Sequence, residues 1–347
     1  MSKIRTAVIG AGKMGGLHSR IYSQLDSVEL VAVVDSDLTK AQASAKAYGG
    51  RACSEVTDIL NAVDAVTVAV PTEFHAEIAE PFLSRGIPVL MEKPLAATLE
   101  EARHLLQVAC AHGCILQVGY SERFNPVIQA MKRLDFTPRF IEAQRISPFT
   151  FRSTDVGVVL DMMIHDIDII LSMAHSFVRD VQAVGVNILG EHEDIANVRL
   201  EFENGCVATL TASRLAMKSQ RKVRVFSEQA YLSLDNLEKT GIIISKTANI
   251  DMVQKIRGAL NDEGELDLQA LDWTELVNIE NLDIDEREPL MLEQEAFIKA
   301  VAEQSRPEVS AEDAIAAMEL AEKIVNKIAE HKWEGSDSAA ISAEHFK

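Results

Sequence analysis

The feature that most constrains this fold is a glycine-rich turn near the start of the chain. The stretch IRTAVIGAGKMGGLHSRIY joins an apolar, strand-like run to a helical pattern, with glycines in the spacing G-x-G-x-x-G. Gly10 permits the tight turn, Gly12 lets a pyrophosphate approach the backbone, and Gly15 lets the helix pack close to the strand. The helix N-terminus would present free N–H groups and a positive dipole end to the phosphates. We expect six residues of this turn to contact a dinucleotide: Gly10, Ala11, Gly12, Lys13, Met14 and Gly15.

A second strand-like run, VELVAVVD, ends in Asp35, 20 residues after Gly15. A carboxylate at this place can bind both ribose hydroxyls of NAD, and it would repel the additional phosphate of NADP. We therefore expect NAD as the cofactor. The competing interpretation is a glycine turn inside a doubly wound domain that binds nothing.

Strand–helix units continue to about residue 121. The runs DAVTVAVP, IPVLMEKP and CILQVGY each read as a buried strand followed by a turn. Ligands of such sheets bind beyond the carboxyl ends of the strands, so the residues after each strand should meet at one edge. This predicts a Rossmann dinucleotide-binding domain over residues 1–121. Its remaining cofactor-binding residues are expected to be Pro71, Thr72, His75, Glu92 and Lys93.

After Pro126 the pattern changes to strands joined by turns, with amphipathic helices near the end. EDIANVRLEFENGCVATLTASR alternates apolar and polar residues around Asn204-Gly205, which is typical of a hairpin. We expect residues 122–331 to form an α+β domain with a largely antiparallel open sheet and helices on one face. No element is assigned to residues 251–285, and residues 332–347 are expected to form a loose tail.

One segment of the second domain, LDMMIHDIDIIL, places ionisable side chains in an otherwise apolar run. At about 3.6 residues per turn, Asp161, His165 and Asp168 fall on one face of a helix. Asp166 lies off this face and is expected to be structural or solvated. For His165, the alternative to a functional role is a buried histidine with satisfied hydrogen bonds.

The charge of the chain narrows the choice of partners. There are 34 basic and 53 acidic residues, a formal net charge of −19, which argues against nucleic acid or anionic lipid as the main partner. Basic residues nevertheless gather at 121–152 and 213–224, where a solvated sheet face or a subunit contact is the alternative to an anionic ligand. Arg123, Arg145 and Arg152 are hypothetical diphosphate ligands, because guanidinium groups suit phosphate oxygens.

Other classes are excluded by what the sequence lacks. No run approaches the length of a membrane-spanning helix, and the N-terminus leads straight into a strand without room for a signal peptide, so we expect a cytoplasmic protein. The four cysteines form no CxxC pair and have no His or Cys partners at zinc spacing, so no metal site is expected.

The order of the motifs resembles one family over nearly the whole chain. GAGKMG, the strand-end Asp35, VAVPTEFH, MEKP, GYSERFNP and an Asp-x3-His-x2-Asp helix follow one another as in the glucose–fructose oxidoreductase/inositol dehydrogenase (Gfo/Idh/MocA) family. The resemblance implies a Rossmann domain followed by an α+β domain whose open sheet joins subunits into dimers or tetramers. It also implies oxidation or reduction of a sugar or cyclitol hydroxyl with a nicotinamide cofactor and without a metal.

The same resemblance implies three catalytic residues: Lys93, Asp161 and His165. His165 would accept the hydroxyl proton, because the ordinary pKa of histidine lies near working pH. Lys93 would bind the same hydroxyl and stabilise the developing alkoxide. Asp161 would hold the imidazole ring or hydrogen-bond the sugar.

A narrower resemblance concerns the substrate. GYSERFNP, RISPFTFRSTDVGVVLDMMIHDIDIIL and EDIANVRLEFENGCVATLTASR are similar to the UDP-N-acetylglucosamine 3-dehydrogenases. This implies oxidation at C3 of UDP-N-acetylglucosamine, after which an aminotransferase partner aminates the 3-keto product on the way to a diamino-sugar of lipid A or a surface polysaccharide. Substrate contacts are expected from Tyr120, Arg123, Asn125, Arg145, Arg152, Asp161 and His165.

Two alternatives stay open at this point. One is a dehydrogenase of a free sugar or inositol, and the other is a non-catalytic NAD-binding regulator. The sequence leaves undecided which hydroxyl reacts, the physiological direction, and whether the assembly is a dimer or a tetramer.

Overall fold

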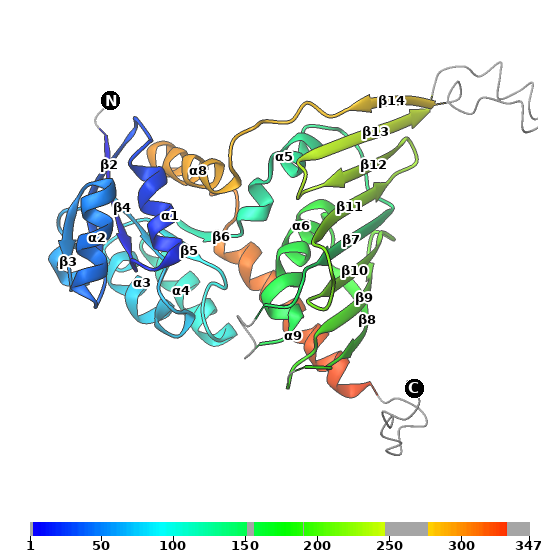
Figure 1. The fold of residues 1–347 in the computed structure, drawn as a ribbon, viewed down its shortest axis with the longest axis horizontal. Helices are drawn as coiled ribbons and strands as arrows, with labels where there is room; N and C mark the ends of the chain where they lie inside the picture. Colours follow the sequence, from blue (N-terminus) through cyan, green and yellow to red (C-terminus); the bar gives the residue numbers. More distant parts are fainter. Residues whose placement is uncertain (1–2, 151–155, 190, 247–276, 332–347) are drawn as a thin grey trace, which may run out of the picture.

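The computed structural model describes residues 3–150, 156–189, 191–246 and 277–331. Two sheets lie side by side along the long axis of the molecule, and helices fill the space between and around them (Figure 1). Within the described ranges no helix is both long and apolar enough to cross a membrane.

The first sheet has six parallel strands in the order β3-β2-β1-β4-β5-β6. Its central strands are short apolar runs buried on both faces, as parallel strands between helices must be, and β4 is buried at every residue. The strands are β1 Ile4–Ile9, β2 Val28–Val34, β3 Arg51–Cys53, β4 Ala65–Val68, β5 Val89–Glu92 and β6 Leu116–Gly119. The helices of this part are α1 Lys13–Tyr22, α2 Leu38–Tyr48, α3 His75–Leu83 and α4 Leu99–Ala111, with short 3₁₀ turns η1 Val56–Asp58, η2 Thr72–Phe74 and η3 Ser121–Phe124.

The second sheet has eight strands in the order β14-β13-β12-β11-β7-β10-β9-β8, antiparallel except for the pair β7–β10. Along β9, Ala196, Val198, Leu200 and Phe202 point to the core while the residues between them are more exposed, the alternation expected of a sheet with one covered face. The strands are β7 Phe140–Ile146, β8 Val178–Val186, β9 Ile195–Phe202, β10 Val207–Ser213, β11 Gln220–Phe226, β12 Ala230–Asp235, β13 Thr240–Lys246 and β14 Val277–Asn281.

Helices cover the inner face of this second sheet, toward the first sheet (Figure 1). They are α5 Pro126–Lys132, the π turn η4 Val159–Met163 with α6 Ile164–Ala174, and α9 Ala311–Glu330. The predicted combination of a parallel Rossmann sheet and a largely antiparallel open sheet is confirmed.

Helix α8, Pro289–Glu303, returns to the first sheet although the chain has by then passed through the second (Figure 1). It lies against α1, where Arg20 pairs with Glu288 at 2.7 Å. Its Phe297 is fully buried in a cluster with Val8 and Leu90 of the first sheet. The layer on this side of the sheet is therefore built from two distant parts of the chain.

Local chemistry sets several element ends, among them the predicted turn at Asn204-Gly205. Thr98 and Ser310 each form a capping box with the acidic residue three positions on. The turn at Asn204-Gly205 joins β9 to β10, and Gly205 adopts the positive φ of 84° that favours glycine. The unassigned stretch 251–285 contains β14, and the predicted tail at 332–347 lies outside the described residues.

Candidate functional site

The glycine turn between β1 and α1 is packed too tightly for side chains at two of its positions. A Cβ on Gly10, whose φ is 95°, would lie 2.4 Å from the carbonyl oxygen of Ala69, and one on Gly15 would lie 1.7 Å from that of Gly10. At Gly12, by contrast, a Cβ would meet nothing within 4 Å, so the backbone there faces open space. Close packing on the inside and free access on the outside are what a phosphate-binding turn requires.

The carboxylate of Asp35 closes this turn from the end of β2. It accepts the Ala11 N–H at 2.7 Å and the Asp37 N–H at 2.9 Å. Helix α1 has Gly12 in its N-cap position, without a side-chain cap and without an acidic residue in its first turn. Its first N–H groups are thus available to an anion, and the residues present fit a dinucleotide.

The side chains of Glu92, the last residue of β5, and Lys93, which follows it, point to opposite sides. Glu92 turns toward α1, where His18 Nε2 lies 2.8 Å from its carboxylate. Lys93 turns toward the second sheet, and its Nζ donates to the backbone oxygen of Asp161 at 3.0 Å and lies 3.7 Å from the Asp161 carboxylate. Burial lowers the pKa of Lys93, while the carboxylates of Asp161 and Glu92 oppose that shift.

His165 lies in the first turn of α6, directly after the π turn that holds Asp161. Its Nδ1 is buried and has no hydrogen-bond partner among the described residues. The ring stands edge-on to Tyr120, with centroids 6.0 Å apart. Burial lowers the pKa of His165 well below 6.5, and the positive charges of Lys93 and Arg145 lower it further, so the ring is neutral at neutral pH.

Lys93 and His165 line the same two cavities. We call the first the Ser147 cavity, of about 240 Å³, and the second the Glu92 cavity, of about 410 Å³. The Ser147 cavity is lined by Lys93, Arg145, Ile146, Ser147, Asp161, Met162, His165, Ser219 and Arg221. The Glu92 cavity is lined by Met14, Ala69, Val70, Glu92, Lys93, Gly119, Ser121, Glu122, Arg145, His165 and Arg221.

Charged side chains of the second sheet form one wall of both cavities. Arg145 is buried and makes two hydrogen bonds of 2.8 Å to Asp166, plus one of 3.2 Å to Glu122. Arg221, opposite Arg145 in the register of β7 and β11, donates to Glu122 at 2.7 Å, and 45% of its side chain is exposed. Asp166 is therefore structural, one of the two expectations for it, and it fixes Arg145 in the wall.

Sequence reasoning did not single out Arg221, Glu122 or Ser147. Arg221 belongs to the basic run 213–224, but that run alone does not tell which residue reaches a cavity. The register with Arg145 identifies it, and a register requires the strands to be paired correctly.

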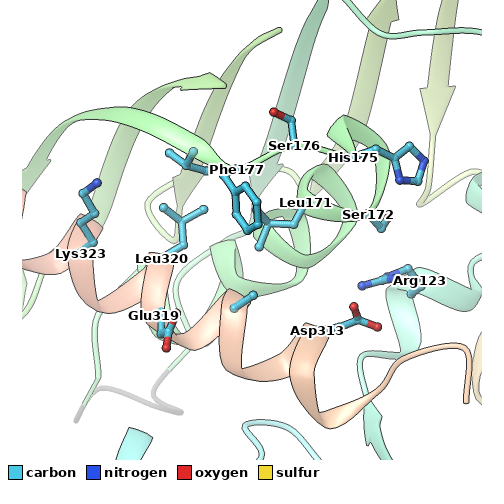
Figure 2. A pocket seen from close by; sticks show the side chains of 12 residues that line it. Arg123, Leu171, Ser172, His175, Ser176, Phe177, Asp313, Glu319, Leu320 and Lys323 are labelled. Carbon is cyan, nitrogen blue, oxygen red and sulfur yellow. The ribbon is translucent and has the colours of Figure 1, made fainter. Parts of the chain in front are cut away.

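Three predicted substrate residues lie elsewhere or outside the described chain. Arg123 is buried in a bidentate pair with Asp168 and lines a different pocket, of about 530 Å³ between α6 and α9, where Asp313 points toward it (Figure 2). Asn125 caps α5 through the Val127 N–H at 3.2 Å. Arg152 falls in the undescribed segment 151–155. The guanidinium of Arg123 and the amide of Asn125 are thus engaged in holding the fold.

The remaining predicted residues surround the first sheet's edge. The ring of Tyr120 is edge-on to that of His165, and the Tyr120 hydroxyl is buried. His75 has its ring nitrogens 2.9 Å from the Pro94 oxygen and 3.1 Å from that of Val70, and burial lowers its pKa. Pro71 precedes η2, and Thr72 lines a third cavity, of about 720 Å³, together with Lys93 and Asp161. No group of His, Cys, Asp or Glu in the described ranges is arranged to hold a metal ion.

Comparison with known proteins agrees with this architecture. Residues 4–120 match the domain described as "Oxidoreductase family, NAD-binding Rossmann fold", and residues 133–233 match the "GFO/IDH/MocA C-terminal domain". A UDP-N-acetylglucosamine 3-dehydrogenase from Acidithiobacillus ferrooxidans is 34% identical over 280 residues, which cover 80% of this chain and 89% of that protein. An inositol 2-dehydrogenase from Rhizobium meliloti is 27% identical over 263 residues, covering 70% of this chain and 78% of that one.

Solved structures give the same result. A structure of the A. ferrooxidans UDP-N-acetylglucosamine 3-dehydrogenase superposes with a TM-score of 0.83 at 30% identity, covering 94% of this chain and 98% of the other. The two domain matches and the relative aligned over most of its length point to the same family. The chain belongs to the GFO/IDH/MocA family of NAD-binding oxidoreductases.

Proposed function

We propose that this protein oxidises the C3 hydroxyl of UDP-N-acetylglucosamine to a ketone with NAD. The observation that carries the proposal is that Lys93, from the first sheet, and His165, from the second, line the same two cavities. The similarity to a UDP-N-acetylglucosamine 3-dehydrogenase supports the choice of substrate.

The proposed roles follow from the geometry. Neutral His165 receives the proton of the sugar hydroxyl, and the ammonium of Lys93 donates to the same oxygen as alkoxide charge develops. Asp161 holds Lys93 through its backbone oxygen at 3.0 Å. NAD, when bound, accepts the hydride from the sugar carbon, so two electrons leave with the hydride and one proton leaves through the imidazole.

The cofactor would lie along the carboxyl edge of the first sheet. The turn from Gly10 to Gly15 would hold the pyrophosphate, with Ala11, Gly12, Lys13 and Met14 supplying backbone contacts, and Asp35 would bind the ribose. Pro71, Thr72, His75, Glu92 and Lys93 would line the remainder of the site. His75 serves there by donating its one ring N–H to the backbone oxygen of Pro94 or of Val70, since both lie within hydrogen-bond distance of its ring.

A nucleotide sugar needs cations for its diphosphate, and Arg221 is the best placed among the described residues. Its side chain lines both cavities, is 45% exposed and pairs with one carboxylate, that of Glu122, whereas Arg145 is buried and bound by two carboxylates. Arg152 remains a second candidate from the sequence. We therefore assign the diphosphate to the Arg221 side of the Ser147 cavity, beyond the sugar ring at Lys93 and His165.

The direct test is to incubate the purified protein with NAD and UDP-N-acetylglucosamine and to follow NADH by absorbance. A ketone trap or a pathway aminotransferase should be present, because an unfavourable 3-keto equilibrium would hide the reaction. NADH should form with the nucleotide sugar and not with free N-acetylglucosamine. If no NADH forms from the nucleotide sugar under these conditions, but NADH forms from inositol or glucose, the nucleotide-sugar proposal is refuted.

The second candidate is a dehydrogenase of inositol or a free sugar, favoured by the similarity to an inositol 2-dehydrogenase. An Arg221→Ala substitution separates the two. It should raise KM for the nucleotide sugar about tenfold or more, as loss of a charged hydrogen-bond partner does. It should leave KM for inositol nearly unchanged. A binding-only regulator, the third alternative, would form no NADH with any of these substrates.

We also propose a homodimer or homotetramer assembled through the second sheet, whose outer face carries no helix in the described part of the chain (Figure 1). Residues 1–121 and 122–331 remain the proposed domain limits, and the cytoplasm the proposed location. Sedimentation of the purified protein would give the number of subunits.

A further inference from the structure

One face of the first sheet, beneath α1 and α8, carries buried polar side chains that the proposed mechanism does not use. Thr67 of β4, Leu90 of β5 and Gln117 of β6 are register neighbours and so share this face, and Glu92 follows two residues after Leu90. Polar groups are unexpected in this layer, because it otherwise contains apolar residues such as Val8 and Phe297. Buried polar groups need hydrogen-bond partners, and the partners of this group lead to the adjacent site.

Three side chains of this layer, Gln294 of α8, His18 of α1 and Glu92, form a chain of hydrogen bonds that ends on the site. The Nε2 of Gln294, on α8, lies 2.5 Å from His18 Nδ1 and 3.3 Å from the His18 backbone oxygen. With the amide N–H donating to Nδ1, Nδ1 is the acceptor and Nε2 carries the N–H. That proton points to the Glu92 carboxylate, 2.8 Å away. Both His18 and Gln294 are fully buried, so the packing around them fixes the direction of this chain.

Glu92 thereby holds a fixed negative charge against the Glu92 cavity. Its second carboxylate oxygen accepts the Lys93 N–H at 3.3 Å, and only 14% of the side chain is exposed. The cavity also includes Met14, a residue of the glycine turn that would hold the pyrophosphate. The neighbouring Glu293 adds no second charge, since burial and the charge of Glu92 raise its pKa well above the usual range.

We propose that His18 and Gln294 are positioning residues that hold the Glu92 carboxylate beside the oxidised nicotinamide ring. The ring is positively charged when oxidised and neutral when reduced, so a carboxylate held here favours binding of NAD+ over NADH. In a partly desolvated cavity this charge–charge interaction is stronger than in water. The inference rests on the cofactor and cavity of the proposed function, but it does not depend on which sugar reacts.

The test measures the dissociation constants of NAD+ and NADH by calorimetry, without any sugar. A His18→Leu variant, which removes the donor to Glu92, should weaken NAD+ binding about tenfold more than NADH binding. Glu92→Gln should change the ratio of the two constants at least as much. His18→Gln should restore most of the ratio, because its side-chain amide can donate in place of the imidazole N–H.

The matched control is Tyr22→Phe, which removes another buried hydrogen bond of α1, the one of 2.7 Å to Thr67. It should leave the NAD+/NADH ratio unchanged, whatever it does to stability. An unchanged ratio in folded His18→Leu overturns the positioning role, even where Glu92→Gln shifts the ratio. No binding of either cofactor form by the wild type would instead refute the cofactor site of the proposed function.

A second measurement serves where His18→Leu does not fold. ¹⁵N spectra of the wild type, with the His18 signals identified by their loss in His18→Gln, should show a protonated Nε2 and an unprotonated Nδ1. The opposite tautomer would place the proton on the Gln294 side and overturn the inference. Gln294→Leu, which leaves Nδ1 without its donor, should shift the NAD+/NADH ratio in the same direction as His18→Leu.

Discussion

Lys93 and His165 each sit where a regular element ends or begins. Lys93 directly follows β5, and His165 occupies the first turn of α6, after the π turn Val159–Met163. Such π turns inside helices often occur at functional sites, because the extra residue changes the direction of nearby side chains. Here the turn also brings the Asp161 backbone oxygen within 3.0 Å of Lys93 Nζ.

Substitution of either residue by alanine should lower kcat by about two orders of magnitude or more, as expected for loss of an acid–base or electrostatic group. NADH affinity should be nearly unchanged in His165→Ala, because this residue is assigned to the sugar alone. Steady-state kinetics and cofactor titration check the two statements. Turnover near the wild-type value in both variants would remove the proposed mechanism.

The pH dependence of kcat/KM follows from the shifted pKa values. His165 acts as a base when neutral, and its lowered pKa keeps it neutral below the ordinary value of 6.5, so the acid limb should lie below pH 6.5. Lys93 acts as an ammonium, and its pKa is lowered from 10.5, so the alkaline limb should lie below pH 10.5.

Removing the Asp161 carboxylate with Asp161→Asn should move the alkaline limb to lower pH, because that carboxylate raises the Lys93 pKa. An alkaline limb that stays in place would show that Lys93 does not control it.

At this scale the sequence predicts the glycine turn and an acidic residue, Asp35, at the end of the second strand, and it leads to Lys93, Asp161 and His165 through the family resemblance. It does not separate Arg123 from Arg221. Both are arginines in basic stretches, and both suit phosphate oxygens equally well. Both have an acidic partner, but Arg123 is buried in its pair with Asp168 of α6, whereas Arg221 stays 45% exposed beside Glu122, and this difference in burial exists only in the folded chain.

Helix α6 shows how an element can carry structural and functional charges together. Asp166 and Asp168 are buried and each holds an arginine, whereas His165 faces the cavities. Breaking a buried pair by removing one partner leaves an uncompensated charge, which typically costs about 3–5 kcal/mol. Loss of either partner of these two pairs should therefore destabilise the segment.

Asp166→Asn should accordingly lower the free energy of unfolding by about 3 kcal/mol or more, because Arg145 loses its bidentate partner. Urea denaturation measures this. The matched control is Glu319→Gln, which breaks the exposed pair with Arg103 and should cost about 1 kcal/mol or less. Equal effects of the two substitutions would contradict the structural role of the Asp166 pair.

Element boundaries are predicted well where local chemistry sets them. The capping boxes at Thr98 and Ser310 and the turn at Gly205 depend on residues within four positions of one another. The π turn and strand β14 are different, since neither follows from a hydrophobic period. The π turn is contacted from the distant Lys93, which donates to the Asp161 backbone oxygen, and β14 is paired with β13.

On the scale of the whole molecule, the two-domain architecture was predictable because parallel and antiparallel strands differ in their apolar patterns. The return of α8 to the first sheet was not predictable. Its amphipathic pattern shows that one face is buried but not against which sheet. The buried cluster of Phe297 with Val8 and Leu90 shows that α8 covers the first sheet, and this cluster exists only in the folded chain.

A fragment of residues 1–121 should therefore be poorly soluble, because it exposes the apolar surface that α8 covers. Joining residues 286–306 to this fragment through a Gly/Ser linker should restore a cooperative urea transition. The same fusion with Phe297→Asp, which places a charge in the buried contact, should not. A soluble fragment 1–121 with the same transition as the fusion would show that α8 is dispensable.

The path of α8 also bears on how such genes can be recombined. Most of the nucleotide-binding half is encoded in one block, but the helix that completes it carries Gln294, encoded 276 codons downstream of its partner His18. A single crossover between two related genes would pair a sheet with a helix from the other parent. Productive chimeras should therefore exchange both segments at once, or neither.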